Sequence, residues 1–144
     1  MTGRHPARVL WLIKGLGRGG AERLLSLSVP HLRRDRYQVE VAYLLPHKRA
    51  LVDEIAGRGI PVHCLGGRLG ADPSWMWRLW RLLRTGAYDL VHTHSPYPAV
   101  AARLLAGRRG PLVVHTEHNV WPRYRLPTFT ANAATYGRNR AVIA

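Results

Sequence analysis

Short apolar runs alternate with amphipathic or alanine-rich segments along this chain of 144 residues. The apolar runs have the length of buried strands and cover residues 9–13, 38–45, 60–65, 90–94 and 112–116, with residues 141–144 resembling the opening of a sixth. The segments between them have helical periodicity or composition and cover residues 21–34, 50–56, 74–84 and 98–106. This alternation predicts a parallel sheet with helices on both faces.

Right-handed crossovers turn such an alternation into a doubly wound, Rossmann-like α/β sheet. The strands at residues 9–13 and 90–94 are then neighbours at the point where the strand order reverses. Ligands of such sheets bind beyond the carboxyl ends of the strands at that point. Polar residues that follow these strands are therefore the first candidates for a site.

The formal net charge of +14 comes almost wholly from arginine, since Lys14 and Lys48 are the only lysines. A GC-rich genome explains part of such a bias, and an anionic membrane surface or a phosphate-bearing substrate would explain it functionally. The basic residues are spread along the chain rather than gathered in a tail. This distribution disfavours an RNA-binding arm, so no nucleic-acid partner is expected.

Hydrophobicity and cysteine content indicate the expected cellular location of the protein. No apolar run approaches the ~20 residues that cross a bilayer, and the basic residues 1–8 lead into a short strand rather than a signal peptide. The single cysteine, Cys64, excludes an internal disulfide, suits a reducing cytoplasm and is expected in the core. We expect one cytoplasmic domain, with the inner face of the cell membrane as a candidate peripheral contact.

A glycine-rich stretch at residues 13–23, IKGLGRGGAER, follows the first predicted strand. It contains the spacing G-x-G-x-x-G at Gly15, Gly17 and Gly20, with Gly19 before the last. Glycines allow positive φ and close backbone approach at little cost. The N–H groups at the start of the next helix can then meet a phosphate. The alternative is a tight strand–helix turn without a ligand.

A dinucleotide-binding loop would require an acidic residue near the end of the second strand, to hold the ribose hydroxyls. That strand ends in Leu-Leu-Pro-His without an acid, and Glu40 lies inside it. No G-K-[ST] follows the glycines either, so the loop is not a P-loop. The nicotinamide interpretation is therefore disfavoured and stays only as an alternative.

Two further polar clusters follow the fourth and fifth predicted strands, namely His94-Ser95-Pro96-Tyr97 and Glu117-His118-Asn119. Parallel strands bring both clusters and the glycine loop to one edge of the sheet. His92 and His94 share a strand face, so a metal pair completed by His118 is conceivable, but we expect no metal. Ser95 lacks the G-x-S-x-G turn of a hydrolase nucleophile.

The helix predicted at residues 74–84 is rich in tryptophan and arginine. The spacing i, i+3, i+4, i+7 predicts a core-facing stripe made of Met76, Leu79, Trp80 and Leu83. Trp77 and the arginines would then face outward. They form either an interfacial basic–aromatic surface or an ordinary solvated face.

Three motifs together make the chain resemble the family 4 glycosyltransferases: GGAER in the first loop, YDLVHTHSPYPAVAARLLA over residues 88–106, and VVHTEHN over residues 113–119. The resemblance covers essentially the whole chain. It implies a GT-B architecture, in which two Rossmann-like domains face each other across a cleft. It also implies sugar transfer from a nucleotide-sugar, with retention and without a metal or another cofactor.

On this resemblance the chain corresponds to the amino-terminal, acceptor-binding domain of that architecture. The glycine loop of Gly15, Gly17, Gly19 and Gly20 would lie near the donor diphosphate. His118 would lie near the transferred sugar, where a hydrogen bond could stabilise charge that develops in the transition state. The acceptor side would be lined by His94, Ser95, Tyr97, Glu117 and Asn119.

The resemblance does not extend to the family's carboxy-terminal domain, which carries the nucleotide pocket and a glutamate–seven residues–glutamate motif. We therefore expect residues 1–144 to be truncated at the sixth strand, as a fragment or a split-gene product completed by a separate chain. Alone they should have negligible transferase activity. Two alternatives stay open: a non-enzymatic module that binds anionic lipid or glycan, and a small dinucleotide-binding oxidoreductase.

Overall fold

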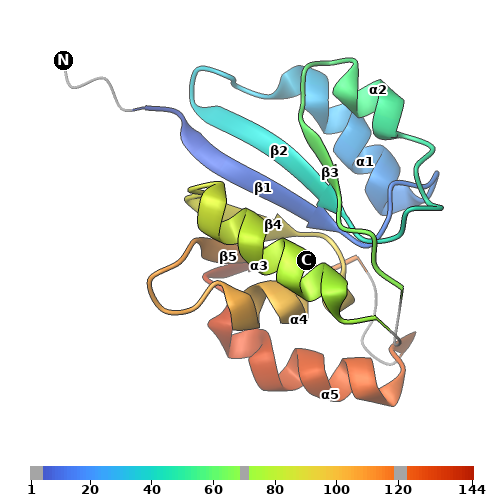
Figure 1. Cartoon of the computed structure of the whole chain (residues 1–144), viewed down its shortest axis with the longest axis vertical. Coiled ribbons are helices and arrows are strands. Elements are labelled where there is room, and N and C mark those ends of the chain that lie inside the picture. Colours follow the sequence, from blue (N-terminus) through green and yellow to red (C-terminus); the bar gives the residue numbers. More distant parts are fainter. Residues whose placement is uncertain (1–4, 69–71, 119–122) are drawn as a thin grey trace.

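The computed structural model describes residues 5–68, 72–118 and 123–144, which form a parallel six-stranded sheet flanked by helices (Figure 1). The strand order is β3-β2-β1-β4-β5-β6. The strands are β1 Ala7–Ile13, β2 Tyr37–Tyr43, β3 Val62–Cys64, β4 Leu90–Thr93, β5 Leu112–Thr116 and β6 Ala141–Ile143. The predicted doubly wound α/β sheet is confirmed, and β1 pairs with β4 where the strand order reverses.

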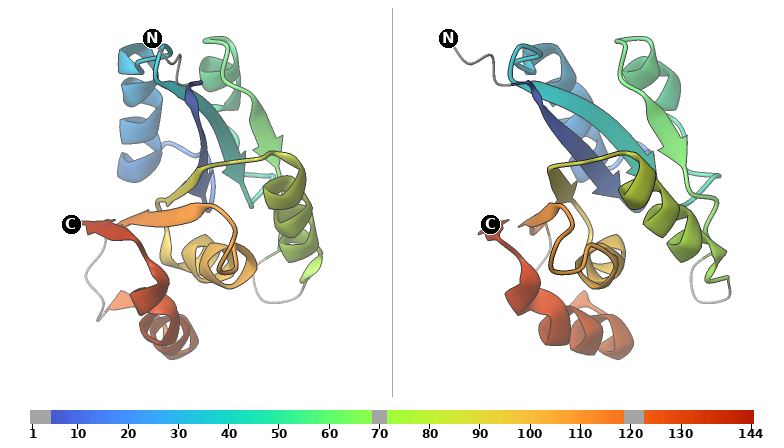
Figure 2. Two further views of the ribbon diagram at one scale, coloured as in Figure 1. Left: turned by 90° about the vertical axis from the view of Figure 1, so that its left-hand side faces the viewer. Right: turned by 60° about the vertical axis from the view of Figure 1, so that its left-hand side comes forward.

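Helices cover the two faces of the sheet in separate layers, as Figure 2 shows. They are α1 Gly20–Ser28, α2 Val52–Ala56, α3 Ser74–Thr85, α4 Pro96–Leu105 and α5 Leu126–Thr135, with the 3₁₀ turns η1 Val29–His31 and η3 Tyr136–Arg138. One core lies between the sheet and α1 and α2, and the other lies between the sheet and α3 and α4. α5 packs on α4 at the outside of the second layer.

β1 belongs to both cores from Val9 to Ile13, which explains the unbroken apolar sequence of that part of the strand. Leu10 and Leu12 are buried in the core under α3 and α4, whereas Trp11 and Ile13 are buried in the core under α1 and α2. Successive side chains of a strand point to opposite faces of the sheet. A central parallel strand therefore needs apolar residues at every position.

The structure differs from the predicted helices in two places. The first helix ends at Ser28 rather than near residue 34, and the chain tightens into η1, with Pro30 in its first turn. Proline has no N–H to donate, so an α-helix does not continue regularly through it. α5 is absent from the sequence-based prediction, which places no helix between residues 116 and 141.

Two predicted core residues lie at the surface. In α3 the buried side chains are Trp75, Leu79 and Leu83, so the buried stripe is rotated from the predicted one and Trp80 is 43% exposed. Cys64 is exposed as well. It ends β3, a strand of three residues at the edge of the sheet, where only one neighbouring strand covers the backbone.

Candidate functional site

A polar cavity of about 330 Å³ opens at the carboxyl edge of the sheet, beside the ends of β1 and β4. Its lining comes from three loops, the start of α1 and the residues after β5: Lys14, Gly15, Gly20, Ala21, Glu22, Lys48, His94, Ser95 and His118. We call this space the polar cavity. Five of the predicted site residues are therefore brought together here, namely Gly15, Gly20, His94, Ser95 and His118.

The glycine loop lies against the loop that follows β2. The Leu16 N–H donates to the Lys48 carbonyl at 2.7 Å, and the Leu51 N–H donates to the Leu16 carbonyl at 3.0 Å. A Cβ on Gly15 would come within 2.8 Å of the Lys48 Cβ. Close approach between the two loops is therefore the reason that this position requires glycine.

The loop glycines do not use the positive φ that glycine allows. Positive φ occurs at Gly59, Gly66 and Gly107 among the described glycines, and at none of the four in the loop. Gly17 has no heavy atom within 4 Å of a Cβ built on it, and it does not line the polar cavity. Gly19 is the N-cap of α1 and faces the carboxylate of Glu22.

Both lysines of the chain line the polar cavity, a result that the sequence analysis missed. Partial burial, together with the charges of Lys48 and Arg125, lowers the pKa of Lys14. Three cations therefore act on one another at this edge, beside the start of α1, where the helix dipole also favours an anion. The scarcity of lysine in an arginine-rich chain was the signal that could have pointed to these two positions.

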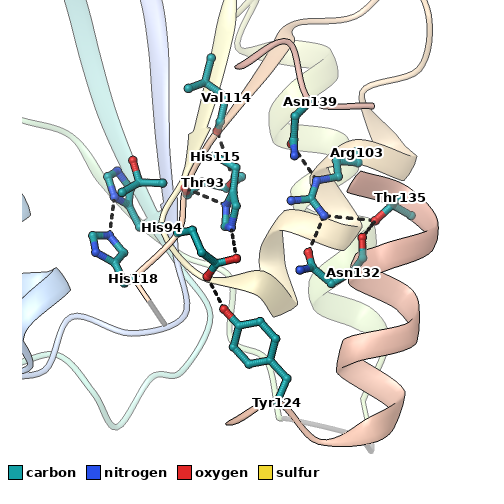
Figure 3. A network of polar contacts seen from close by, with 12 residues as sticks. Thr93, His94, Arg103, Val114, His115, His118, Tyr124, Asn132, Thr135 and Asn139 are labelled. Carbon is teal, nitrogen blue, oxygen red and sulfur yellow. Dashed lines mark hydrogen bonds and ion pairs between the residues drawn. The ribbon is translucent and has the colours of Figure 1, made fainter. Parts of the chain in front are cut away.

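Three histidine rings lie close together at this edge: His92 in β4, His94 directly after it, and His118 after β5. His94 and His118 stack and line the polar cavity. His94 Nδ1 lies 3.4 Å from His118 Nε2, and the His92 ring centroid lies 4.2 Å from that of His94 (Figure 3 shows the His94–His118 pair). Burial, and then the neighbouring His92 and His118, lower the pKa of His94 to about 3. Burial, then His115 and His118, lowers the pKa of His92 to about 4. Both rings are therefore neutral at pH 7.

Polar contacts fix His92 and the residue that follows His94. His92 Nε2 lies 2.7 Å from the Thr116 hydroxyl, and the Lys14 N–H donates to Ser95 Oγ at 3.4 Å. Among the described residues, His94 Nε2 is buried without a hydrogen-bond partner. Ser95 thus links the end of β1 to the start of α4, while His94 retains an unsatisfied nitrogen.

Two further predicted site residues, Glu117 and Tyr97, do not line this cavity. Glu117 lies 3.5 Å from the buried His115 and accepts a hydrogen bond from the Tyr124 hydroxyl (Figure 3). Tyr97 packs on Trp75 with ring centroids 5.5 Å apart, in an apolar cavity between α3, α4 and α5. Asn119 lies outside the described residues.

Neither a metal nor a dinucleotide has an evident set of ligands in this part of the structure. Among the described residues, no three His, Cys, Asp or Glu side chains are grouped to hold a metal ion. Glu40, the acid of β2, is engaged with the Arg8 guanidinium at 2.9 Å, His63 at 2.7 Å and the Tyr88 hydroxyl at 2.6 Å. It does not line the polar cavity.

Comparison with known proteins identifies the class of protein that carries this cavity. The family model Glycosyltransferase Family 4 matches residues 18–144. The chain belongs to glycosyltransferase family 4. A curated relative, the UDP-Gal:alpha-D-GlcNAc-diphosphoundecaprenol alpha-1,3-galactosyltransferase of Escherichia coli, is 36% identical over 69 residues, which are 47% of this chain and 18% of that enzyme.

Solved structures agree with family 4 membership at the level of the fold. HepE of Anabaena in complex with UDP aligns with a TM-score of 0.72 and 20% identity, over 95% of this chain and 37% of HepE. Its complex with UDP-glucose aligns with a TM-score of 0.68 and 21% identity, over the same shares of both chains. The sheet is thus a Rossmann-like part of a GT-B architecture, and the chain spans little more than a third of HepE.

The surface of α3 is the other notable feature of this family 4 domain. Trp77 is 57% exposed, and the Arg81 guanidinium lies over its ring at 5.6 Å from the centroid. Arg84 lies over the exposed Trp80 in the same way, at 5.9 Å. No helix within the described ranges is long and apolar enough to cross a membrane.

Proposed function

We propose that this chain is the acceptor-binding half of a retaining, metal-independent glycosyltransferase that uses a nucleotide-sugar donor. The single observation that carries the proposal is the polar cavity, in which the glycine loop, His94 and His118 meet at one edge of the sheet. Family 4 membership gives the reaction class. The likeness to HepE, whose structures contain UDP and UDP-glucose, supports a nucleotide-sugar donor.

Each side of the cavity has a role in this proposal. The glycine loop and the start of α1 face the donor diphosphate. Lys14 and Lys48 give the cavity positive charge that attracts the phosphates of both donor and acceptor. His118 contacts the transferred sugar, and a hydrogen bond from it stabilises charge that develops in the transition state. His94, neutral and in contact with His118, holds that ring in position. Ser95 lies on the acceptor side, and Asn119, outside the described residues, keeps its predicted role there.

A donor-binding half must complete the enzyme, because the chain spans only 37% of HepE. Co-expression with a candidate carboxy-terminal domain, followed by a sugar-transfer assay, tests the proposal. We expect transfer that survives EDTA and a product with the anomeric configuration of the donor. His118→Ala should lower the rate about 100-fold, the usual effect of removing one transition-state donor.

His31 provides the matched control, since it is exposed at the end of η1 and does not line the polar cavity. His31→Ala should leave the transfer rate unchanged. The proposal fails if the assembled protein transfers no sugar, or if His118→Ala and His31→Ala behave alike.

A peripheral contact with an anionic membrane is part of the same proposal. The Escherichia coli relative acts on a diphosphoundecaprenol-linked sugar, and an acceptor of that class resides in a membrane. Trp77 and Trp80, each paired with an arginine, give α3 the aromatic and cationic groups of an interfacial helix. This surface also favours the second candidate function, a non-enzymatic module that binds anionic lipid.

Liposome flotation tests the membrane contact. Vesicles with anionic lipid should carry the chain in a salt-sensitive manner, because the attraction is screened within about 10 Å at 0.1 M salt. Trp77→Ala with Trp80→Ala should weaken flotation, whereas Tyr37→Ala, at an exposed aromatic position on β2, should not. Equal flotation with neutral and anionic vesicles would count against the contact. Flotation without sugar transfer in the assembled protein would favour the non-enzymatic module.

A further inference from the structure

A second cavity, of about 190 Å³, lies between α3, α4 and α5. It is lined mainly by apolar side chains, among them Trp75, Val100, Leu104, Pro127 and Ala131. We call it the apolar cavity. The polar side-chain groups among the described lining residues are the hydroxyls of Tyr97 and Thr128 and the indole N–H of Trp75. Apolar cavities of about 150 Å³ stay dry and bind small hydrocarbons, so this space is large enough to take part of a hydrocarbon chain.

The apolar cavity lies next to the polar cavity along the chain. Ser95 lines the polar cavity, and Tyr97, two residues later in the first turn of α4, lines the apolar one. Arg125 caps α5 and lowers the pKa of Lys14, while Pro127, two residues later, lines the apolar cavity. Two separate segments therefore pass from the cationic site to the apolar space.

Exposed apolar groups surround the apolar cavity. Leu104, part of its lining, is 46% exposed. Leu126 and Phe129, in the same turn of α5 as Pro127, are 73% and 37% exposed. Large apolar groups gathered beside a cavity mark a surface that a ligand or a lipid covers. The cations at the polar cavity attract an anion, so the other end of such a ligand should be negatively charged.

The geometry points to a binding site for the hydrocarbon chain of an anionic lipid, with its phosphate groups at Lys14, Lys48 and Arg125 and its chain in the apolar cavity. This inference rests on the proposed function, since the lipid would be the acceptor. An amphiphile with a phosphate head matches the two cavities together, whereas a soluble sugar would leave the apolar one empty. Tyr97, predicted on the acceptor side, would then contact the lipid rather than the sugar.

Calorimetric titration of the whole chain with three probes tests the inference. The probes are farnesyl diphosphate below its micellar concentration, inorganic pyrophosphate and farnesol. Each buried methylene strengthens binding about fourfold. Farnesyl diphosphate should therefore bind at least about tenfold more tightly than pyrophosphate, and farnesol should bind more weakly than farnesyl diphosphate.

Two substitutions that fill the apolar cavity from opposite walls should remove this preference. Ala131→Phe on α5 and Val100→Phe on α4 should each bring the affinity for farnesyl diphosphate down to that for pyrophosphate, with the latter unchanged. Ala134→Phe is the matched control, since Ala134 lies on α5 but is exposed and does not line the cavity. Circular dichroism and thermal unfolding show which variants are folded, and two filling variants keep the test valid if one is not.

The inference is overturned if farnesyl diphosphate binds no more tightly than pyrophosphate, as it would if another segment of the polypeptide occupied the cavity. It is also overturned if the folded filling variants keep the preference, or if Ala134→Phe abolishes it equally. These results leave the proposed transferase untouched as long as pyrophosphate binds. Loss of pyrophosphate binding itself would instead contradict the cationic site on which the proposed function depends.

Discussion

Two polar clusters lie within this small domain and differ in the hydrogen bonds that join their members. The arginine cluster surrounds Arg103, which is 2% exposed in α4 and donates hydrogen bonds to three residues of α5 and the segment after it: Asn132 at 2.7 Å, Thr135 at 3.2 Å and Asn139 at 2.8 Å (Figure 3). The histidine cluster of His92, His94 and His118 lies beside the polar cavity. Its rings are joined by a long contact of 3.4 Å between His94 and His118, and by a ring contact between His92 and His94 with centroids 4.2 Å apart.

The difference separates a structural role from a functional one. Arg103 has short bonds to its neighbours and lies over the Tyr136 ring at 5.3 Å, so its interactions are directed into the protein and hold α5 on α4. His94 has an unsatisfied buried nitrogen and a weak contact to the neighbouring ring. Buried polar groups usually have partners. Both clusters contain buried nitrogens without a partner among the described residues, His94 Nε2 in one and Arg103 Nη2, Asn132 Nδ2 and Asn139 Nδ2 in the other. The histidine cluster is nevertheless the better candidate for ligand binding, because the glycine loop and both lysines line the same cavity as His94 and His118.

The largest expected effect is on the arginine cluster. Arg103→Ala removes the donors to Asn132 and Asn139 and should cost about 3 kcal/mol in the free energy of unfolding, because buried groups then lose their partners. Urea unfolding measures it. Arg108→Ala, at an exposed position after α4, should change stability by less than about 0.5 kcal/mol. Similar values for the two variants would show that the arginine cluster is not structural.

The histidine cluster should make stability depend on pH. Folding lowers the pKa of His94 to about 3 and of His92 to about 4, so between these values and about 6.5 the unfolded state binds more protons. The free energy of unfolding is therefore unaffected by protonation of these histidines above about pH 6.5. It decreases as the pH falls below that value, by up to about 1.4 kcal/mol per pH unit for each histidine. Thermal unfolding between pH 7.5 and 5 measures the slope.

Replacing one histidine tests whether the histidine cluster causes this dependence of stability on pH. His94→Asn should flatten it, since one buried group no longer has to be kept neutral. The groups that act on His94 are His92, His115 and His118. The carboxylates of Glu40, Glu54 and Asp72 have lowered pKa values and contribute only at more acidic pH, as the pH falls below about 4.5. An unchanged slope in His94→Asn would contradict the neutral, buried state of this ring.

The two lysines of the polar cavity should control its affinity for anions. Lys48→Gln removes a charge from the lining and should weaken pyrophosphate binding about tenfold, because a charge-assisted hydrogen bond contributes about 1.5 kcal/mol or more. Arg18→Gln removes the same charge from an exposed residue of the glycine loop that does not line the cavity. Calorimetry on both variants distinguishes a localised site from general positive charge, which would make their effects equal.

The parts of the fold that the sequence predicts are those built from local apolar patterns, whereas the part held by the arginine cluster was missed. β1 and β5 are short apolar runs of the kind that parallel sheets bury, so their positions and pairing follow from pattern alone. The position of α5 does not follow from pattern, because its buried residues are Asn132 and Thr135 rather than an apolar stripe. Its docking depends on Arg103, more than twenty residues earlier, and helical periodicity carries no information about such a partner.

The residues of the candidate site were likewise predicted only where topology alone places them. The sheet edge that gathers Gly15, His94 and His118 follows from topology, since carboxyl ends of parallel strands lie together. Lys14 and Lys48 were missed because they enter through loop contacts that no local pattern encodes. The phase of α3 was also ambiguous, because aromatic residues occupy several faces of the helix and Trp80 fits a core stripe as well as Trp75 does.

The smallest expected effect distinguishes glycines within one loop. Gly15→Ala places a methyl group 2.8 Å from the Lys48 Cβ, so it should cost about 1 kcal/mol and weaken pyrophosphate binding by displacing Lys48. Gly17→Ala meets no atom within 4 Å and should leave both quantities unchanged. Urea unfolding and calorimetry compare the pair. If both variants bind pyrophosphate equally well, the contact between Gly15 and Lys48 does not shape the polar cavity, and the G-x-G-x-x-G spacing has no bearing on anion binding here.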